Sequence, residues 1–165
     1  MLASITILGV IAAAVIPLLS SNDPQKLSVA AEETANTLRF ALSKASRTGS
    51  YVLVDGKSPT GQLGLYNSDS SGNLNSAIND PLTKRAAILD VSGSPFSRGV
   101  SLTPQFRAGG SARPQLLIGP GLTQMQGFDG TSEGALQPNS GVLLSYGGQS
   151  ITVSLNEATG LVSLP

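Results

Sequence analysis

The sequence predicts an α+β protein in which a long N-terminal α-helix precedes an antiparallel β-sandwich of about eight strands. The first observation is that the opening residues are apolar without interruption and lead into a segment with helical periodicity. The second is that the rest of the chain consists of short apolar runs separated by turn formers, with 19 glycines and 10 prolines overall. We expect an apolar helix at residues 1–20, an amphipathic stem helix at 21–48 and a β-domain at 49–165.

The apolar segment has the length of a membrane-spanning helix. Residues 1–19 carry no charge, and their only polar side chains are Ser4 and Thr6. At ~1.5 Å per residue they would cover roughly 28 Å, close to the ~30 Å hydrocarbon core of a bilayer. We therefore expect a membrane or filament-core helix that is kinked at Pro17. A buried core helix and a secretory signal peptide are the alternatives, although the residues after Met1 lack the basic region of a signal peptide.

The stem helix has a start signal, a stop signal and one apolar stripe. Asp23 and Pro24 are a capping residue followed by proline at the first helical position, and Gly49 is a typical residue just after a helix. Between them, residues with small or apolar side chains recur at steps of three and four, which is helical periodicity. The stripe consists of Leu27, Ala30, Ala31, Thr34, Leu38, Ala41, Leu42 and Ala45.

The β-domain is predicted from its apolar runs and turns. The expected strands lie at residues 51–55, 62–66, 85–91, 100–106, 115–118, 141–146, 150–155 and 160–164. Gly147-Gly148 is a two-residue hairpin signal and residues 156–160 form a second turn, so the last three strands should make an antiparallel meander. Residues 67–80 contain few apolar side chains and are predicted to be an exposed loop.

Composition excludes several function classes. The chain has no Cys and no His, which excludes thiol nucleophiles, Fe–S clusters, Ser-His-Asp triads and most catalytic zinc sites. Ten Lys+Arg balance ten Asp+Glu, so a basic nucleic-acid-binding surface is not expected. We expect no enzyme activity and no cofactor. Asp129, Thr131 and Glu133 alternate as oxygen ligands for a metal ion, but only two are carboxylates, so a capped turn is the favoured interpretation.

Motifs at both ends of the chain resemble one protein family. The run ITILGVIAAAVIP, with Gly9 eight residues before Pro17, resembles type IV pilin-like proteins. The ending FDGTSEGALQPNSGVLLSYGGQSITVSLNEATGLVSLP and the segment EETANTLRFALSKASRTGSYVLV are similar to minor pseudopilins of the GspH/FimT group. In that family the mature chain begins F-T-L-x-E after a basic leader ending in Gly, and alignment on Gly9 and Pro17 places this glutamate immediately before Met1.

The resemblance implies a structural subunit of a type II secretion pseudopilus that helps initiate or cap the filament. It implies a single-pass protein of the bacterial inner membrane, with the β-domain in the periplasm and other pseudopilin or pilin subunits as partners. The expected assembly-helix residues are Leu8, Gly9, Ala12, Ala13 and Pro17, and the expected stem interface is Leu27, Ala31, Leu38 and Leu42. The alternatives are a FimT/FimU-like minor pilin for adhesion or DNA uptake, and a membrane-tethered periplasmic binding module.

Overall fold

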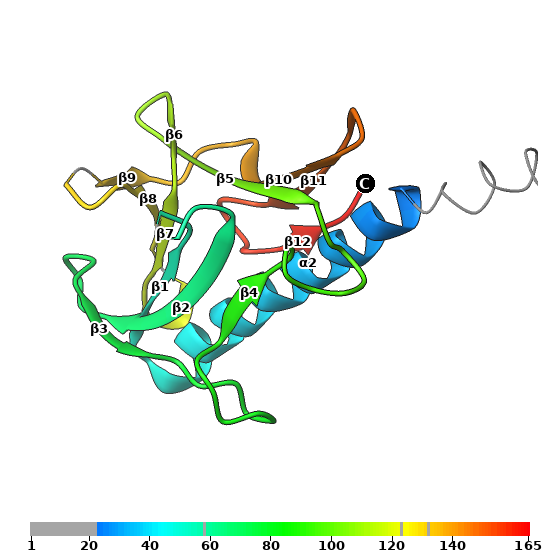
Figure 1. Cartoon of the computed structure of the whole chain (residues 1–165). Helices are drawn as coiled ribbons and strands as arrows, with labels where there is room; N and C mark the ends of the chain where they lie inside the picture. The colour runs from blue at the N-terminus through cyan, green and yellow to red at the C-terminus, as the bar shows by residue number, and fades with distance from the viewer. Residues whose placement is uncertain (1–22, 58, 123, 132) are drawn as a thin grey trace, which may run out of the picture.

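The computed structural model describes residues 23–57, 59–122, 124–131 and 133–165. Within them a helix precedes a series of antiparallel strands, which confirms the predicted α+β class and element order (Figure 1). The apolar helix expected at residues 1–20 lies outside the described residues, as do its members Leu8, Gly9, Ala12, Ala13 and Pro17. None of the helices in the described part of the chain combines the length and the hydropathy needed to cross a bilayer.

Helix α2 spans Asp23–Thr48, and its 26 residues lie within the range 21–48 expected for the stem helix. The helix ends where Gly49 adopts a left-handed conformation with φ of +62°, and the Gly49 N–H donates to the Ala45 carbonyl at 3.2 Å. All eight residues of the predicted stripe are buried. The buried hydroxyl of Thr34 donates to the Ala30 carbonyl at 2.7 Å, so this polar member leaves no unpaired donor in the core.

The strands form two antiparallel sheets. The larger sheet contains β3 (Leu74–Ala77), β2 (Gln62–Ser68), β1 (Tyr51–Asp55), β7 (Gln115–Ile118), β8 (Met125–Phe128) and β9 (Glu133–Ala135) in that order, with β4 (Ile88–Asp90) also paired to β2. The smaller sheet contains β12 (Val162–Ser163), β11 (Gln149–Leu155), β10 (Ser140–Tyr146), β5 (Ser101–Ala108) and β6 (Ser111–Arg113) in that order. A short 3₁₀ turn, η1 (Pro120–Leu122), joins β7 to β8.

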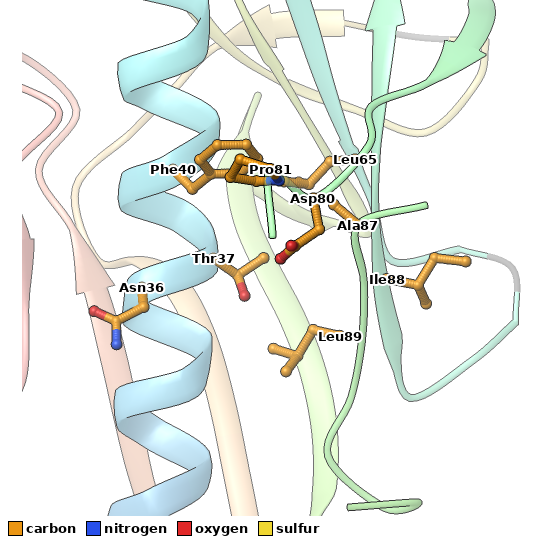
Figure 2. Close-up of a pocket in the computed structure, with 9 residues that line it drawn as sticks. All are labelled: Asn36, Thr37, Phe40, Leu65, Asp80, Pro81, Ala87, Ile88 and Leu89. Atoms are coloured by element: carbon orange, nitrogen blue, oxygen red, sulfur yellow. The ribbon is translucent and has the colours of Figure 1, made fainter. Parts of the chain in front are cut away.

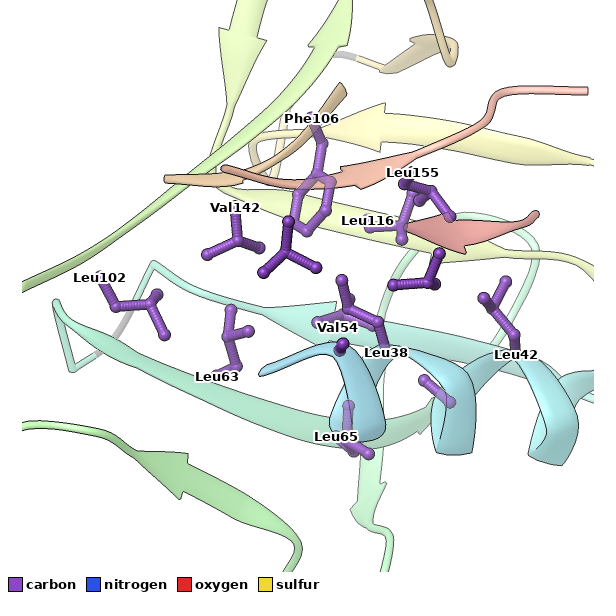
Figure 3. Close-up of a cluster of buried hydrophobic side chains, with 14 of the residues drawn as sticks. Leu38, Leu42, Val54, Leu63, Leu65, Leu102, Phe106, Leu116, Val142 and Leu155 are labelled. Atoms are coloured by element: carbon purple, nitrogen blue, oxygen red, sulfur yellow. The ribbon is translucent and has the colours of Figure 1, made fainter. Parts of the chain in front are cut away.

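The main hydrophobic core lies between the helix and both sheets. Figure 3 shows Leu38 and Leu42 of α2 beside core side chains from the larger sheet, such as Val54, and from the smaller sheet, such as Val142. The helix contacts β1, β4 and β7 of the larger sheet and β10, β11 and β12 of the smaller one, while β5 packs against β7, β8 and β9. The core is thus enclosed by a helix and two sheets, and these sheets do not form the clear antiparallel β-sandwich that the sequence predicts.

All eight predicted strands correspond to observed strands, but β3, β6, β8 and β9 are additional. The prediction of an exposed loop at residues 67–80 is wrong in part, because this mostly exposed segment contains the strand β3 and the buried Ile78. The Ile78 N–H donates to the Leu65 carbonyl at 2.8 Å, and the Ile78 carbonyl accepts from the Ala87 N–H at 2.7 Å. The C-terminal meander is confirmed, with positive φ at both Gly147 and Gly148, as a two-residue hairpin of this type requires.

Candidate functional site

A groove runs along one flank of α2, between the helix and the segment that connects β3 to β4. Residues 79–86 of this segment form a short hairpin closed by the Asn79–Ala86 bridge, which we call the β3–β4 hairpin, while β3 and β4 themselves both pair with β2. The groove consists of two hollows with volumes of about 280 Å³ and 360 Å³, and both are lined by Phe40 and Pro81. Figure 2 shows the first hollow, with Phe40 and Thr37 on the helix opposite Pro81 and Asp80 on the hairpin. The two hollows meet at Phe40 and Pro81 and together form one elongated site.

The helix wall of the groove comes from residues beside the buried stripe. Thr37, Phe40 and Lys44 are separated by three and four positions, so their side chains lie on the same flank of the helix. All three are half-buried, whereas the neighbouring Leu38 and Ala41 are fully buried. The flank is therefore the border between the core face and the exposed face of α2.

The opposite wall is a hairpin held together by hydrogen bonds. Asn79 and Ala86 form an antiparallel bridge, and between them Oδ1 of Asp80 accepts from the N–H groups of Leu82 and Thr83 at 2.7 Å and 2.8 Å. The hydrogen bond from the Thr83 N–H is the main cause that holds the pKa of Asp80 below its ordinary value, followed by the bond from Leu82. Asp80 is therefore a charged group in the hairpin wall at neutral pH, and Figure 2 shows its carboxylate turned toward the helix.

The two hollows differ in chemical character. The first is lined by apolar side chains that include Leu65, Ala87 and Leu89, and it contains the one lining carboxylate, Asp80. The second is lined by Lys44 and Arg47 from the last turns of the helix and contains no carboxylate. The groove therefore has an apolar half and a basic half.

The four predicted stem-interface residues do not line this groove. Leu27, Ala31, Leu38 and Leu42 expose 6% or less of their surface and belong to the core between α2 and the two sheets. The interface that they form in the structure is within the chain. They are not accessible to another subunit in this conformation.

Of the two metal candidates, Asp129 lies in a turn with its own partners and Glu133 begins β9. Asp129 forms an ion pair with Arg113, and its Oδ1 accepts from the backbone N–H and the hydroxyl of Thr131, each at 3.0 Å. Glu133 is exposed on β9. No group of three or more metal-binding side chains occurs in the described ranges. The contacts between Asp129 and Thr131 are those of a capped turn.

A buried polar pair joins the ends of β1 and β7. The Gln115 side-chain amide donates to Oδ1 of Asp55 at 2.9 Å, and the same oxygen accepts from the Lys57 N–H at 2.9 Å. Gln115 Oε1 and Arg113 Nε are buried without a hydrogen-bond partner in the structure. This pair keeps a buried carboxylate hydrogen-bonded next to a strand end, which is a structural role.

Sequence reasoning did not identify the groove. Its apolar half combines three separate segments of the chain: Phe40 of the helix, Leu65 of β2, and Ala87 and Leu89 at β4. The only sequence signal near it is Lys84-Arg85, the one adjacent pair of basic residues.

The chain was also compared with known proteins. No family model, no curated protein and no solved structure matches it. The pilin-like resemblance therefore rests on the sequence motifs at the two ends of the chain, and the structure adds the groove as the candidate site.

Proposed function

We propose that the chain is a structural assembly subunit, a minor pseudopilin that helps initiate or cap the pseudopilus of a type II secretion system. The observation that carries the proposal is the uncharged apolar segment at residues 1–19, which leads into a helix that is itself fixed to a β-domain. Within this proposal, the two sheets and α2 together make the sandwich-like head of the subunit.

In the proposed mechanism, the apolar segment holds the subunit in the inner membrane until assembly. Assembly then exchanges contacts with lipid for contacts with the helices of other subunits, and the small residues Gly9, Ala12 and Ala13 permit close approach of the helices. One face of α2 is buried against both sheets. This burial supports a mechanical connection between the helix and the β-domain. Movement of the helix would carry the periplasmic β-domain with it, because the two share one core.

The proposal is tested by placing a charge in the apolar segment. Ala13→Glu should abolish incorporation into the filament, because an unpaired carboxylate is costly in an apolar helix interface. Ser46→Glu is the matched control, since Ser46 is exposed on the stem helix and the new carboxylate remains in water. Incorporation is measured as the fraction of the subunit that co-sediments with sheared filaments.

Replacement of the apolar segment by a foreign membrane anchor could contradict the proposal. If residues 1–20 are replaced by an unrelated membrane anchor and both incorporation and secretion remain complete, the segment is only a tether and the proposed assembly role is wrong. Incorporation into a type IV pilus instead of a pseudopilus would support the minor-pilin alternative, which uses the same mechanism.

A second candidate function is a membrane-tethered periplasmic binding module, and the groove along α2 favours it. This candidate predicts that the foreign anchor preserves function, whereas substitutions that fill the groove remove it. The same two sets of variants therefore distinguish the two functions.

A further inference from the structure

We propose that the groove between α2 and the β3–β4 hairpin binds an extended segment of a partner protein that carries one or two apolar side chains next to a cluster of acidic residues. This inference does not depend on filament assembly, because it uses only the walls of the groove. It concerns the flank of the helix that the core leaves accessible.

The shape of the groove suits a chain in extended conformation. Each hollow is near the lower limit of the ~300–1,000 Å³ typical of ligand pockets. The hollows adjoin at Phe40 and Pro81 and continue along the helix, so a segment that fills both must be elongated. Such a segment would place alternate side chains in the groove, as extended peptides do in other recognition sites.

The apolar half of the groove provides the anchor. Phe40, Ala87 and Leu89 are partly buried and pack against the main core, which holds this part of the wall in place. Ile88 is also at the wall and is about half-exposed at 49%. An apolar side chain that enters this hollow removes its own surface and that of these residues from water, which is the main source of affinity at such sites.

The basic half of the groove indicates that a partner segment should carry negative charge. Lys44 and Arg47 line the second hollow, and Lys84 and Arg85 lie in the turn of the facing hairpin. The structure records one ion pair among the residues that it describes, Arg113–Asp129, so none of these four cations forms an ion pair with another described side chain. The charge of Lys84 also contributes to lowering the pKa of the Asp80 carboxyl, after the hydrogen bonds from Thr83 and Leu82. Two of the ten Lys and Arg residues of a chain with zero net charge therefore line the second hollow, and two more are in the hairpin that faces it. A cluster of carboxylates would match them.

An acidic protein segment fits the groove better than a nucleic acid. Asp80 keeps a negative charge in the first hollow, which opposes a phosphate backbone that follows the whole groove. The apolar half offers no cation to that backbone, whereas nucleic-acid binding relies on repeated phosphate contacts. A segment whose acidic residues all lie at one end avoids this repulsion.

The test uses the full-length chain and two fluorescein-labelled peptides, one with Phe and Leu followed by Glu-Asp-Glu and one with the two halves in reverse order. Fluorescence anisotropy should show saturable binding of at least one of them with Kd below about 1 mM. Replacing its acidic residues by Lys-Arg-Lys, or its apolar residues by serine, should remove binding. Higher salt should weaken binding, because the cations are exposed to solvent.

Protein variants locate the site. Lys44→Glu with Arg47→Glu should weaken binding by about tenfold or more. Arg98→Glu with Arg107→Glu is the matched control, because it makes the same change in net charge at two exposed residues that do not line the groove. Thr37→Phe should also weaken binding, since it fills the apolar hollow from the helix side.

Three outcomes would overturn the inference. The first is that neither acidic peptide binds saturably. The second is an equal loss in the control variant, which would indicate a general charge effect. The third is that a single-stranded oligonucleotide binds more tightly than the peptides and loses binding in the Lys44→Glu, Arg47→Glu variant. Each outcome leaves the Ala13→Glu test of filament assembly unaffected, so failure here is distinguishable from failure of the proposed function.

Discussion

Two sides of helix α2 have different roles although they are adjacent. The stripe that includes Leu38 is fully buried against both sheets, while the flank that includes Thr37, Phe40 and Lys44 is half-buried and lines the groove. The spacing of apolar residues predicts which side of the helix is buried. It does not predict whether the covering surface belongs to the same chain or to another subunit.

The buried stripe therefore contributes to stability, and the flank is the side proposed for recognition. Four members of the stripe, Leu27, Ala31, Leu38 and Leu42, were predicted to form a stem interface, and in the structure they pack in the core between the helix and its own β-domain. The flank, whose residues are polar, aromatic and basic, is accessible to a partner together with the exposed face of the helix. Substitutions on the two sides should differ in the same way, and the following predictions test this from the largest effect to the smallest.

The largest effect is expected on the buried side. Leu38→Ala should lower the free energy of unfolding by about 2–5 kcal/mol, because it removes a fully buried side chain and leaves a cavity. Ser43→Ala, on the exposed groove side, should change it by less than about 0.5 kcal/mol. Urea denaturation of both variants measures the two values. Similar losses in the two variants would contradict the division between the two sides of the helix.

A smaller effect is expected where the buried stripe ends. Gly49→Ala should cost about 1–2 kcal/mol, because φ of +62° is strained for alanine, while no atom within 4 Å would obstruct its Cβ. Gly49→Asn should cost less, since asparagine tolerates this conformation. Thermal denaturation of the two variants gives the comparison. Equal costs for Ala and Asn would show that the backbone conformation at this position is not the cause.

Much of this fold could be predicted because several residues act through local rules. Asp23-Pro24 and Gly49 mark the helix ends, and Gly147-Gly148 specifies a hairpin through two positive φ values. The turn before β12 is also local, because Oδ1 of Asn156 accepts from the Ala158 N–H and from the N–H and hydroxyl of Thr159. Such signals do not depend on the rest of the chain.

The strands that sequence reasoning missed depend on distant neighbours. Every residue of β3 is exposed, so it has no alternation of buried and exposed residues. In β8, Gly127 lies where a Cβ would be 2.6 Å from the Phe106 carbonyl oxygen, so the glycine is required by the other sheet. The groove was missed for the same reason, because the sequence cannot show that Leu65 and Leu89 face Phe40.

The next smaller effect on stability is expected where α2 meets the β10–β11 hairpin. Lys26 Nζ donates to the Tyr146 hydroxyl at 2.9 Å and lies 4.6 Å from the ring centroid. Lys26→Met should cost about 0.5–1.5 kcal/mol, because it removes both the hydrogen bond and the cation–π contact. Tyr146→Phe removes the hydrogen bond alone and should cost less. A double-mutant cycle measures the coupling between the two residues, and a coupling of zero would show that this contact does not hold the helix to the hairpin.

The smallest effect should appear in acid, and only at the hairpin wall of the groove. The folded pKa of Asp80 is below its ordinary value of 3.8, so the stability that its hydrogen bonds contribute is present above that value and is lost as the pH falls through the lower folded pKa. Asp80→Asn should remove this part of the pH dependence, because the amide oxygen can still accept from Leu82 and Thr83 but cannot titrate.

Amide proton shifts in NMR spectra locate the effect directly. Those of Leu82 and Thr83 should titrate with a midpoint below 3.8, because both N–H groups donate to the Asp80 carboxylate. The Leu38 amide should not follow this titration, since it lies within α2 and is not bonded to the hairpin. If the Leu38 shift moved with the same midpoint, the hairpin wall and the buried side of the helix would respond as one unit, and the division between recognition and stability on α2 would be wrong.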